Sequence, residues 1–199
     1  MTAKPVATDD YSLIDGRPRC SWVRDVPLDV QYHDEEWGVP VHDDPLLFEL
    51  LSLEGAQAGL SWLTVLQRRA GYRRVFKKFN PRVVATFDNG VVAAILNDEG
   101  VIRHRQKIES VVNNAHAVLE MQKRHGSLDG YLWGLGTTQG ESNAVSKSMS
   151  KQLQKDGFKF VGPTICHSLR QASGMVNDHS TTCFRHREIE GLDGFRAQH

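Results

Sequence analysis

The stretch Asp44–Leu53 reads DPLLFELLSL, and it indicates the class of fold. Leucines stand at positions 46, 47, 50, 51 and 53, which places a broad apolar face on a helix. Asp44 is the expected N-cap of this helix, directly before Pro45. Gly55 and Gly59 are expected to interrupt it, because glycine is unfavourable inside a helix.

Similar signals continue on both sides of this stretch. Helices are predicted after a Ser61 cap, from Asn80-Pro81 to a break at Asn89-Gly90, over about 102–123 before Gly126, over about 143–155 before Gly157, and from Gly162-Pro163 to near Gly174. The chain shows no alternating strand pattern, internal repeat or low-complexity block. The sequence therefore predicts an all-α protein of short helices.

The composition is that of a globular protein. The 199 residues are 40% hydrophobic and 24% charged. Neither a membrane-spanning apolar run nor a signal peptide is recognisable, so we expect a cytoplasmic protein that does not act at a membrane. The three cysteines cannot all pair within one chain, and in a reducing compartment they are expected to be free thiols or metal ligands.

The formal net charge is zero, but the charges are distributed unevenly. Residues 1–60 carry twelve acids and four bases, whereas residues 61–199 carry twelve acids and twenty bases. The larger part of the chain is therefore basic. This asymmetry keeps nucleic acid among the possible partners.

Two short patterns suggest a metal site. Cys20 and His33 form C-x12-H near the start, and His179 and Cys183 form H-x3-C within NDHSTTC near the end. Together they supply the four ligands of a tetrahedral structural zinc site, which would clip the two ends of the fold together and leave no position for water. Spacing alone also permits Cys166 or His186 to replace one of these ligands.

Four longer blocks narrow the choice of function. They are Gln31–Pro40 (QYHDEEWGVP), Leu53–Trp62 (LEGAQAGLSW), Gly100–Ile108 (GVIRHRQKI) and Gly157–Cys166 (GFKFVGPTIC), and NDH-x3-C follows them. In this order, from Arg19 to about Cys183, the chain resembles the 3-methyladenine DNA glycosylase I family. That resemblance implies an all-α fold of the helix-hairpin-helix glycosylase superfamily, with zinc on Cys20, His33, His179 and Cys183.

The resemblance also implies an activity and a domain plan. The expected enzyme is a monofunctional glycosylase that flips 3-methyladenine out of double-stranded DNA, hydrolyses the N-glycosidic bond and leaves an abasic site. The partners are then damaged DNA and the free 3-methyladenine product, and a monomer is expected. We expect an N-terminal arm over 1–18, a glycosylase domain of two helical lobes over 19–185 and a polar tail over 186–199.

The base pocket follows from the same resemblance. It assigns base recognition to Glu54 and the aromatic walls to Trp22, Tyr32 and Trp62, with Trp37 in the same block. Glu54 is the sole acid between Leu50 and Phe87, and it follows a leucine-rich helix, so partial burial is expected. The alternative roles are a glutamate that bonds to a helix end and aromatics that belong to the core.

Two positions depart from the pattern of the relatives, and one acid is only a candidate. Asp29 stands where some relatives have a tyrosine, and His167 stands where a tyrosine can occur. Both substitutions bear on the details of the pocket. Asp178 lies nearest the place of the aspartate that many superfamily members use, but the resemblance does not make it catalytic.

A site that binds the DNA backbone is predicted in the block Gly157–Cys166. Gly157, Lys159, Gly162 and Thr164 are expected to hold a DNA phosphate, because glycines allow close approach and the next helix begins there. An ordinary turn between helices is the alternative. The basic run of Arg103, Arg105 and Lys107 is interpreted as a solvated helix face.

Two other functions remain open from the sequence. A zinc hydrolase acting on a nucleoside or another small molecule would need a metal with only three protein ligands. A non-catalytic module that senses damaged nucleic acid would need no excision chemistry. Release of a free base from methylated DNA distinguishes all three functions.

Overall fold

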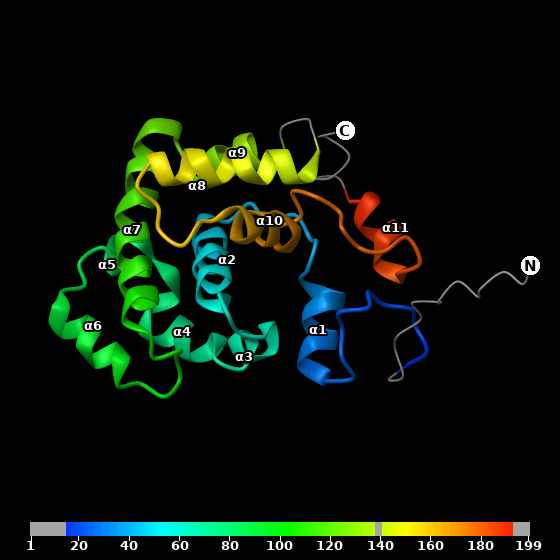
Figure 1. The fold of residues 1–199 in the computed structure, drawn as a ribbon, viewed down its shortest axis with the longest axis horizontal. Helices are drawn as coiled ribbons and strands as arrows, with labels where there is room; N and C mark the ends of the chain where they lie inside the picture. Colours follow the sequence, from blue (N-terminus) through cyan, green and yellow to red (C-terminus); the bar gives the residue numbers. More distant parts are fainter. Residues whose placement is uncertain (1–14, 138–140, 193–199) are drawn as a thin grey trace, which may run out of the picture.

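The computed structural model describes residues 15–137 and 141–192, and within these ranges the chain is helical with no strand (Figure 1). This confirms the all-α prediction. The elements are α1 (Pro27–Glu35), α2 (Asp44–Gln57), α3 (Trp62–Leu66), α4 (Arg69–Val75), the 3-10 turn η1 (Lys77–Phe79), α5 (Pro81–Val84), α6 (Asn89–Leu96), α7 (Arg105–His125), α8 (Leu128–Gly136), α9 (Ser142–Lys155), α10 (Pro163–Ala172) and α11 (Phe184–Glu190). Among the described helices, none has the length and apolar character needed to cross a membrane.

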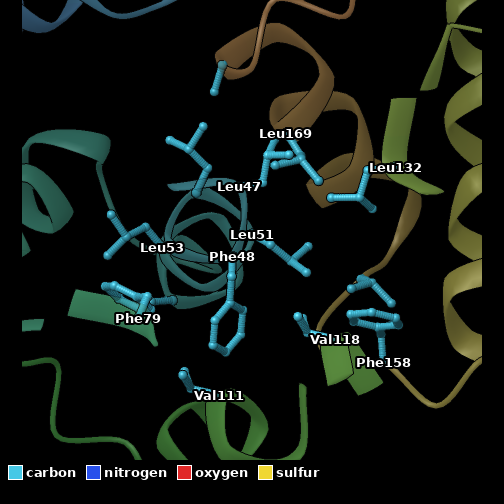
Figure 2. Close-up of a cluster of buried hydrophobic side chains, with 14 of the residues drawn as sticks. Leu47, Phe48, Leu51, Leu53, Phe79, Val111, Val118, Leu132, Phe158 and Leu169 are labelled. Carbon is cyan, nitrogen blue, oxygen red and sulfur yellow. The ribbon is translucent and has the colours of Figure 1, made fainter. Parts of the chain in front are cut away.

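Helix α2 lies at the centre of the fold, between α7, α8 and α10 (Figure 1). Leu47, Phe48, Leu51 and Leu53 point outward from it in several directions and are fully or almost fully buried (Figure 2). Burying each such side chain contributes roughly 1.5–3 kcal/mol. A helix packed on this many sides is a rigid support for Glu54, which lies in its last turn.

The start of α2 differs from the prediction by one residue. Asp43 is the N-cap, and its Oδ1 accepts a hydrogen bond from the Leu46 amide at 2.9 Å. Asp44 instead accepts from the backbone amides of Leu128 and Asp129, at 2.9 and 2.8 Å. Asp44 therefore anchors the first turn of α8 to α2, a long-range contact that the local pattern does not reveal.

Other predicted boundaries can be compared directly. Ser61 and Asn80 cap α3 and α5 as predicted, and α7 ends before Gly126, the C-cap residue, which has a φ of 84°. The expected break at Asn89-Gly90 is wrong, because these residues begin α6 and the Asp88 side chain caps it. Gly55 does not interrupt α2, which continues to Gln57.

The first described residues and the last described helix, α11, both lie on the side of the molecule where α1 is found (Figure 1). Of the expected arm and tail, residues 1–14 and 193–199 lie outside the described residues. The described part of the arm is held by Arg19, which pairs with Asp15, and by the Pro18 carbonyl, which accepts from the Phe184 amide at 3.0 Å. The expected boundary at 185/186 falls inside α11, which buries Ile189 completely. The division into two lobes stays a prediction.

Candidate functional site

A cavity of about 270 Å³ opens beside the ends of α2 and α10. Its lining consists of Trp22, Tyr32, Trp37, Glu54, Gln57, Trp62, Ser168, Gln171 and Asp178. All the side chains predicted to bind a base lie in this lining, together with the candidate acid Asp178. The structure thus gathers residues from α1, α2, α3, α10 and the loops beside them into one site.

Three polar atoms in the lining are buried without a partner among the described residues. They are Glu54 Oε2, Tyr32 Oη and Trp62 Nε1. Burial, which removes the carboxyl from water, raises the pKa of Glu54 to about 8. Burial also raises the pKa of Tyr32, and the nearby Glu54 raises it further. Because buried polar groups are normally satisfied, two potential donors and an acceptor left open on one cavity indicate a polar ligand.

The walls of the cavity are aromatic. The Tyr32 and Trp62 rings lie with centroids 5.2 Å apart, and Trp22 contacts Trp37 edge-on at 5.1 Å. Tyr32 and Trp37 are buried, whereas Trp22 is 37% exposed and lies at the rim. Such walls suit a flat ring that enters from the side of Trp22.

Helix α10 and the segment after it also line the cavity. Gln171 Nε2 donates to Asp178 Oδ2 at 3.0 Å, and His167 Nε2 lies 3.5 Å from the same oxygen. Gln57, Ser168 and Gln171 are lining residues that the sequence does not predict. Ser168 and Gln171 are three residues apart and therefore share a helix face, a signal that could have placed them together.

Neither of the two positions that depart from the relatives lines the cavity. His167 does not line the cavity, but it holds Asp178, which does. Asp29 is fully buried on α1 and accepts from Arg24 Nε at 2.7 Å. These two positions can therefore act on the pocket only through their neighbours.

The predicted metal ligands converge on one buried point. The ligand atoms of Cys20, His33, His179 and Cys183 all lie within 4.8 Å of one another. Two thiols and two imidazoles are the donor set of a structural zinc site, so these residues fit such an ion. Hydrogen bonding to Cys20 lowers the pKa of Cys183, and the same contact raises the pKa of Cys20.

The alternative ligands are engaged elsewhere. Cys166 is buried on α10, where its Sγ lies 3.3 Å from the Val161 carbonyl. His186 Nδ1 faces Glu190 at 3.7 Å. Neither residue belongs to the group of four, so the geometry favours the ligand set given by the two short patterns.

The metal cluster and the cavity share a wall. His33 directly follows Tyr32, and His179 directly follows Asp178. The His179 Nε2–H donates to the Trp37 carbonyl at 3.0 Å, and Trp37 also stacks on His33 with ring centroids 6.1 Å apart. The imidazoles of these two predicted ligands therefore support the aromatic side of the cavity directly.

The hairpin between α9 and α10 contains the residues predicted to bind the DNA backbone. Gly157 has a φ of 90°, in the left-handed region that favours glycine. Asn114 on α7 fixes the hairpin, because its amide donates to the Lys159 carbonyl at 3.0 Å and accepts from the Lys159 amide at 2.8 Å. The Lys159 side chain is exposed.

The second glycine of the hairpin has a different role from the first. Gly162 has an ordinary φ of −62°, and a Cβ there would meet nothing within 4 Å. It precedes the N-terminus of α10, which no side chain caps, and Thr164 is exposed in the first turn. A residue without a side chain leaves these backbone N–H groups accessible, as an anion site requires.

Comparison with known proteins identifies the family. A family model described as methyladenine glycosylase matches residues 22–186. The chain belongs to the methyladenine glycosylase family. It is 45% identical to DNA-3-methyladenine glycosylase 1 of Escherichia coli, with 83% of this chain and 95% of the relative covered.

Solved structures of the family agree with this fold. A crystal structure of 3-methyladenine DNA glycosylase I superposes with a TM-score of 0.80 at 44% identity, covering 83% of this chain and 98% of the other. A 3-methyladenine DNA glycosylase I in complex with 3-methyladenine gives a TM-score of 0.77 at 30% identity, covering 83% and 96%. The predicted all-α glycosylase fold is thereby confirmed.

One lysine of this methyladenine glycosylase differs from its prediction. The sequence predicts a solvated face for Lys107, but this residue is buried, and burial lowers its pKa. Its Nζ donates to the carbonyls of Ala56 and Ala58, at 2.9 and 2.6 Å. Lys107 therefore caps the C-terminal end of α2, immediately after Glu54, and holds the following loop in place.

Proposed function

We propose that this protein excises 3-methyladenine from double-stranded DNA and that the cavity beside α2 and α10 receives the flipped base. The observation that carries the assignment of the cavity is the convergence of the open polar atoms of Glu54, Tyr32 and Trp62 on an aromatic-walled site. N3 of adenine lies in the minor groove of a duplex, so the nucleotide must leave the stack before its base can be enclosed.

Glu54 selects the damaged base by charge. Methylation at N3 makes the nucleoside cationic, whereas normal adenine is neutral. With a pKa of about 8, Glu54 is mostly protonated in the empty cavity at pH 7. Ionising it there costs about 1.4 kcal/mol, which a cation in contact offsets and a neutral base does not. A Glu54 carboxylate also accepts a hydrogen bond from the exocyclic amine.

The chemistry needs little assistance from the protein. When the N-glycosidic bond breaks, its electron pair moves to the cationic base, which leaves neutral. The sugar becomes oxocarbenium-like, and water adds to its anomeric carbon and loses a proton. Glu54 lies deep and Asp178 at the rim, with side-chain exposure of 33% for Asp178. We therefore propose Asp178 as the carboxylate that faces the sugar cation.

The predicted metal ligands stabilise the fold, and the hairpin between α9 and α10 binds the DNA backbone. We propose one zinc ion on Cys20, His33, His179 and Cys183, with a structural role because four protein ligands leave no position for water. The hairpin from Gly157 to Thr164 holds a phosphate without reading sequence. We also propose that the enzyme acts as a monomer in the cytoplasm.

A base-release assay tests this function. Purified protein is incubated with duplex DNA carrying 3-methyladenine, and free base and abasic sites are quantified. Equal amounts of both products are expected. Tight binding to methylated DNA with no release would instead support a damage-sensing module. Prompt loss of activity on chelation, before any unfolding, would support a zinc hydrolase.

A further inference from the structure

Arg19 is completely buried, and its side chain is among the largest of the fully buried side chains. Its guanidinium lies between two carboxylates. Nε and Nη2 donate to Asp34 at 2.8 and 2.5 Å, and Nη1 and Nη2 donate to Asp15 at 2.8 and 2.9 Å. A buried charge of this kind is costly unless it is paired, so the three side chains form one unit.

The same Asp34 reaches the metal cluster. Its Oδ1 accepts from His33 Nδ1 at 2.8 Å. That bond places the proton on Nδ1 and leaves the Nε2 lone pair directed at the other ligands, 3.4 Å from Cys183 Sγ. Carboxylate partners of this type orient the imidazole and increase its basicity. His179 has a neutral partner instead, the Trp37 carbonyl.

We propose that Arg19 is a positioning residue for the metal ion. It holds Asp34 against His33, and it connects the segment that begins at Asp15 to the metal centre. This inference rests on the proposed binding of an ion by the four ligands. Asp15, Arg19 and the ligand Cys20 all precede the residues 22–186 that match the family model, so this part of the metal centre lies outside that region.

The charges in this region balance. Two thiolates neutralise a divalent ion. Asp34 and Asp15 are matched by Arg19 and by Arg17, whose Nε lies 2.7 Å from Asp15. The cation of Arg17 also lies 4.4 Å from the ring centroid of Phe184, the residue after the ligand Cys183. Asp34 can therefore act on His33 without leaving an uncompensated buried charge.

Metal release from the folded protein tests the proposal. Each variant is loaded with zinc and mixed with an excess of a coloured chelator at 25 °C, and circular dichroism verifies that it stays folded. Release from Asp34→Ala and Arg19→Gln should be about 10–100-fold faster than from the wild type, the range typical of partners behind metal ligands. Asp15→Asn should change release in the same direction by less. Asp98→Asn, which breaks the exposed pair with Arg74, is the matched control and should release at the wild-type rate.

A second readout separates positioning from general stability. In the cobalt-substituted protein, the visible absorption bands report the coordination geometry. Asp34→Ala should shift these bands, and Asp98→Asn should not. A purely structural ion pair would lower the melting temperature while leaving both the bands and the release rate unchanged, and that result would overturn the proposal.

The outcomes distinguish this inference from the one on which it rests. A wild-type protein that retains no metal refutes the proposed zinc site itself. A wild type that retains zinc, with Asp34→Ala and Arg19→Gln releasing it at the same rate, refutes only the role of Arg19. If Arg19→Gln does not fold, wild-type release from both Asp34→Ala and Asp15→Asn refutes it equally.

Discussion

Replacing Glu54 by glutamine should make the empty protein more stable while impairing the enzyme. The pKa of Glu54 rises from 4.5 to about 8 on folding. Below pH 4.5 the carboxyl is protonated in both states. As the pH rises toward 8, the unfolded chain ionises and the folded one does not, so the wild type loses stability over this window.

The size of this effect follows from the pKa difference. At pH 7 it amounts to about 3 kcal/mol, and at pH 5 to about 1 kcal/mol, since each pKa unit is worth about 1.4 kcal/mol. Glutamine does not titrate. The stability advantage of Glu54→Gln should therefore grow by about 2–3 kcal/mol between pH 5 and pH 7. For a protein of this size, that is a difference of about 5–10 °C in melting temperature.

Urea denaturation of both proteins at several pH values measures this change. Its dependence on pH isolates the ionisation from the fixed cost of burying an amide. Glu109→Gln, which alters an exposed carboxylate on α7, serves as the control and should show no comparable trend. A constant gap between wild type and Glu54→Gln from pH 5 to pH 7 would refute the reasoning.

The activity of the same variant supplies the second half of the prediction. Without an ionisable group, the cavity cannot become anionic when the cationic nucleotide enters. Excision of 3-methyladenine by Glu54→Gln should fall, and affinity for undamaged duplex should not. For the wild type, kcat/KM below pH 8 should rise with pH as Glu54 ionises. Wild-type excision by the stabilised variant would show that the charge of Glu54 has no role in selection.

The remaining predictions concern the metal, the binding of the DNA backbone and the buried lysine. Cys183→Ser should lose the metal and lower the melting temperature, whereas Cys166→Ser should retain the metal; elemental analysis decides, and full zinc occupancy in Cys183→Ser would contradict the ligand assignment. Lys159→Ala should weaken binding to methylated and unmethylated duplexes equally and reduce the salt slope by about one, while Trp62→Ala should lose free 3-methyladenine binding but keep duplex binding. An unchanged dependence of binding on salt concentration would show that Lys159 does not contact DNA. Lys107→Met should raise KM for damaged DNA, because the loop after α2 is no longer held, and unchanged kinetics would make this contact dispensable.

The metal cluster was the part of the site most accessible to sequence reasoning. Cys and His are uncommon, and the spacing of Cys20 to His33 and of His179 to Cys183 restricts the possible sets. The cavity was accessible because Glu54 interrupts a long acid-free stretch and because the blocks around it resemble a family. Both inferences depend on uncommon residues at characteristic spacings, and such spacings can be recognised in the sequence without a structure.

Contacts between distant segments were not accessible. Lys107 looks like its exposed neighbours Arg103 and Arg105, and only the placement of α7 against α2 reveals that it caps a helix. Asp44 is a residue type that often caps helices, but the neighbouring Asp43 is the N-cap of α2. The Asp44 side chain instead accepts hydrogen bonds from the first turn of α8. Short helices such as α1 and α4 also went unpredicted, because they gain their stability from tertiary packing and carry little periodicity of their own.

The wall shared by the cavity and the metal cluster limits how this enzyme can be re-engineered. Tyr32 and Asp178, which line the cavity, each directly precede a histidine that is a predicted metal ligand, and the Trp37 carbonyl accepts a hydrogen bond from one of these histidines. Moving the backbone to widen the cavity for a bulkier lesion would displace a ligand as well. Variants that accept larger bases should therefore arise by trimming side chains on α10, such as Ser168, because this helix supplies none of the four predicted ligands.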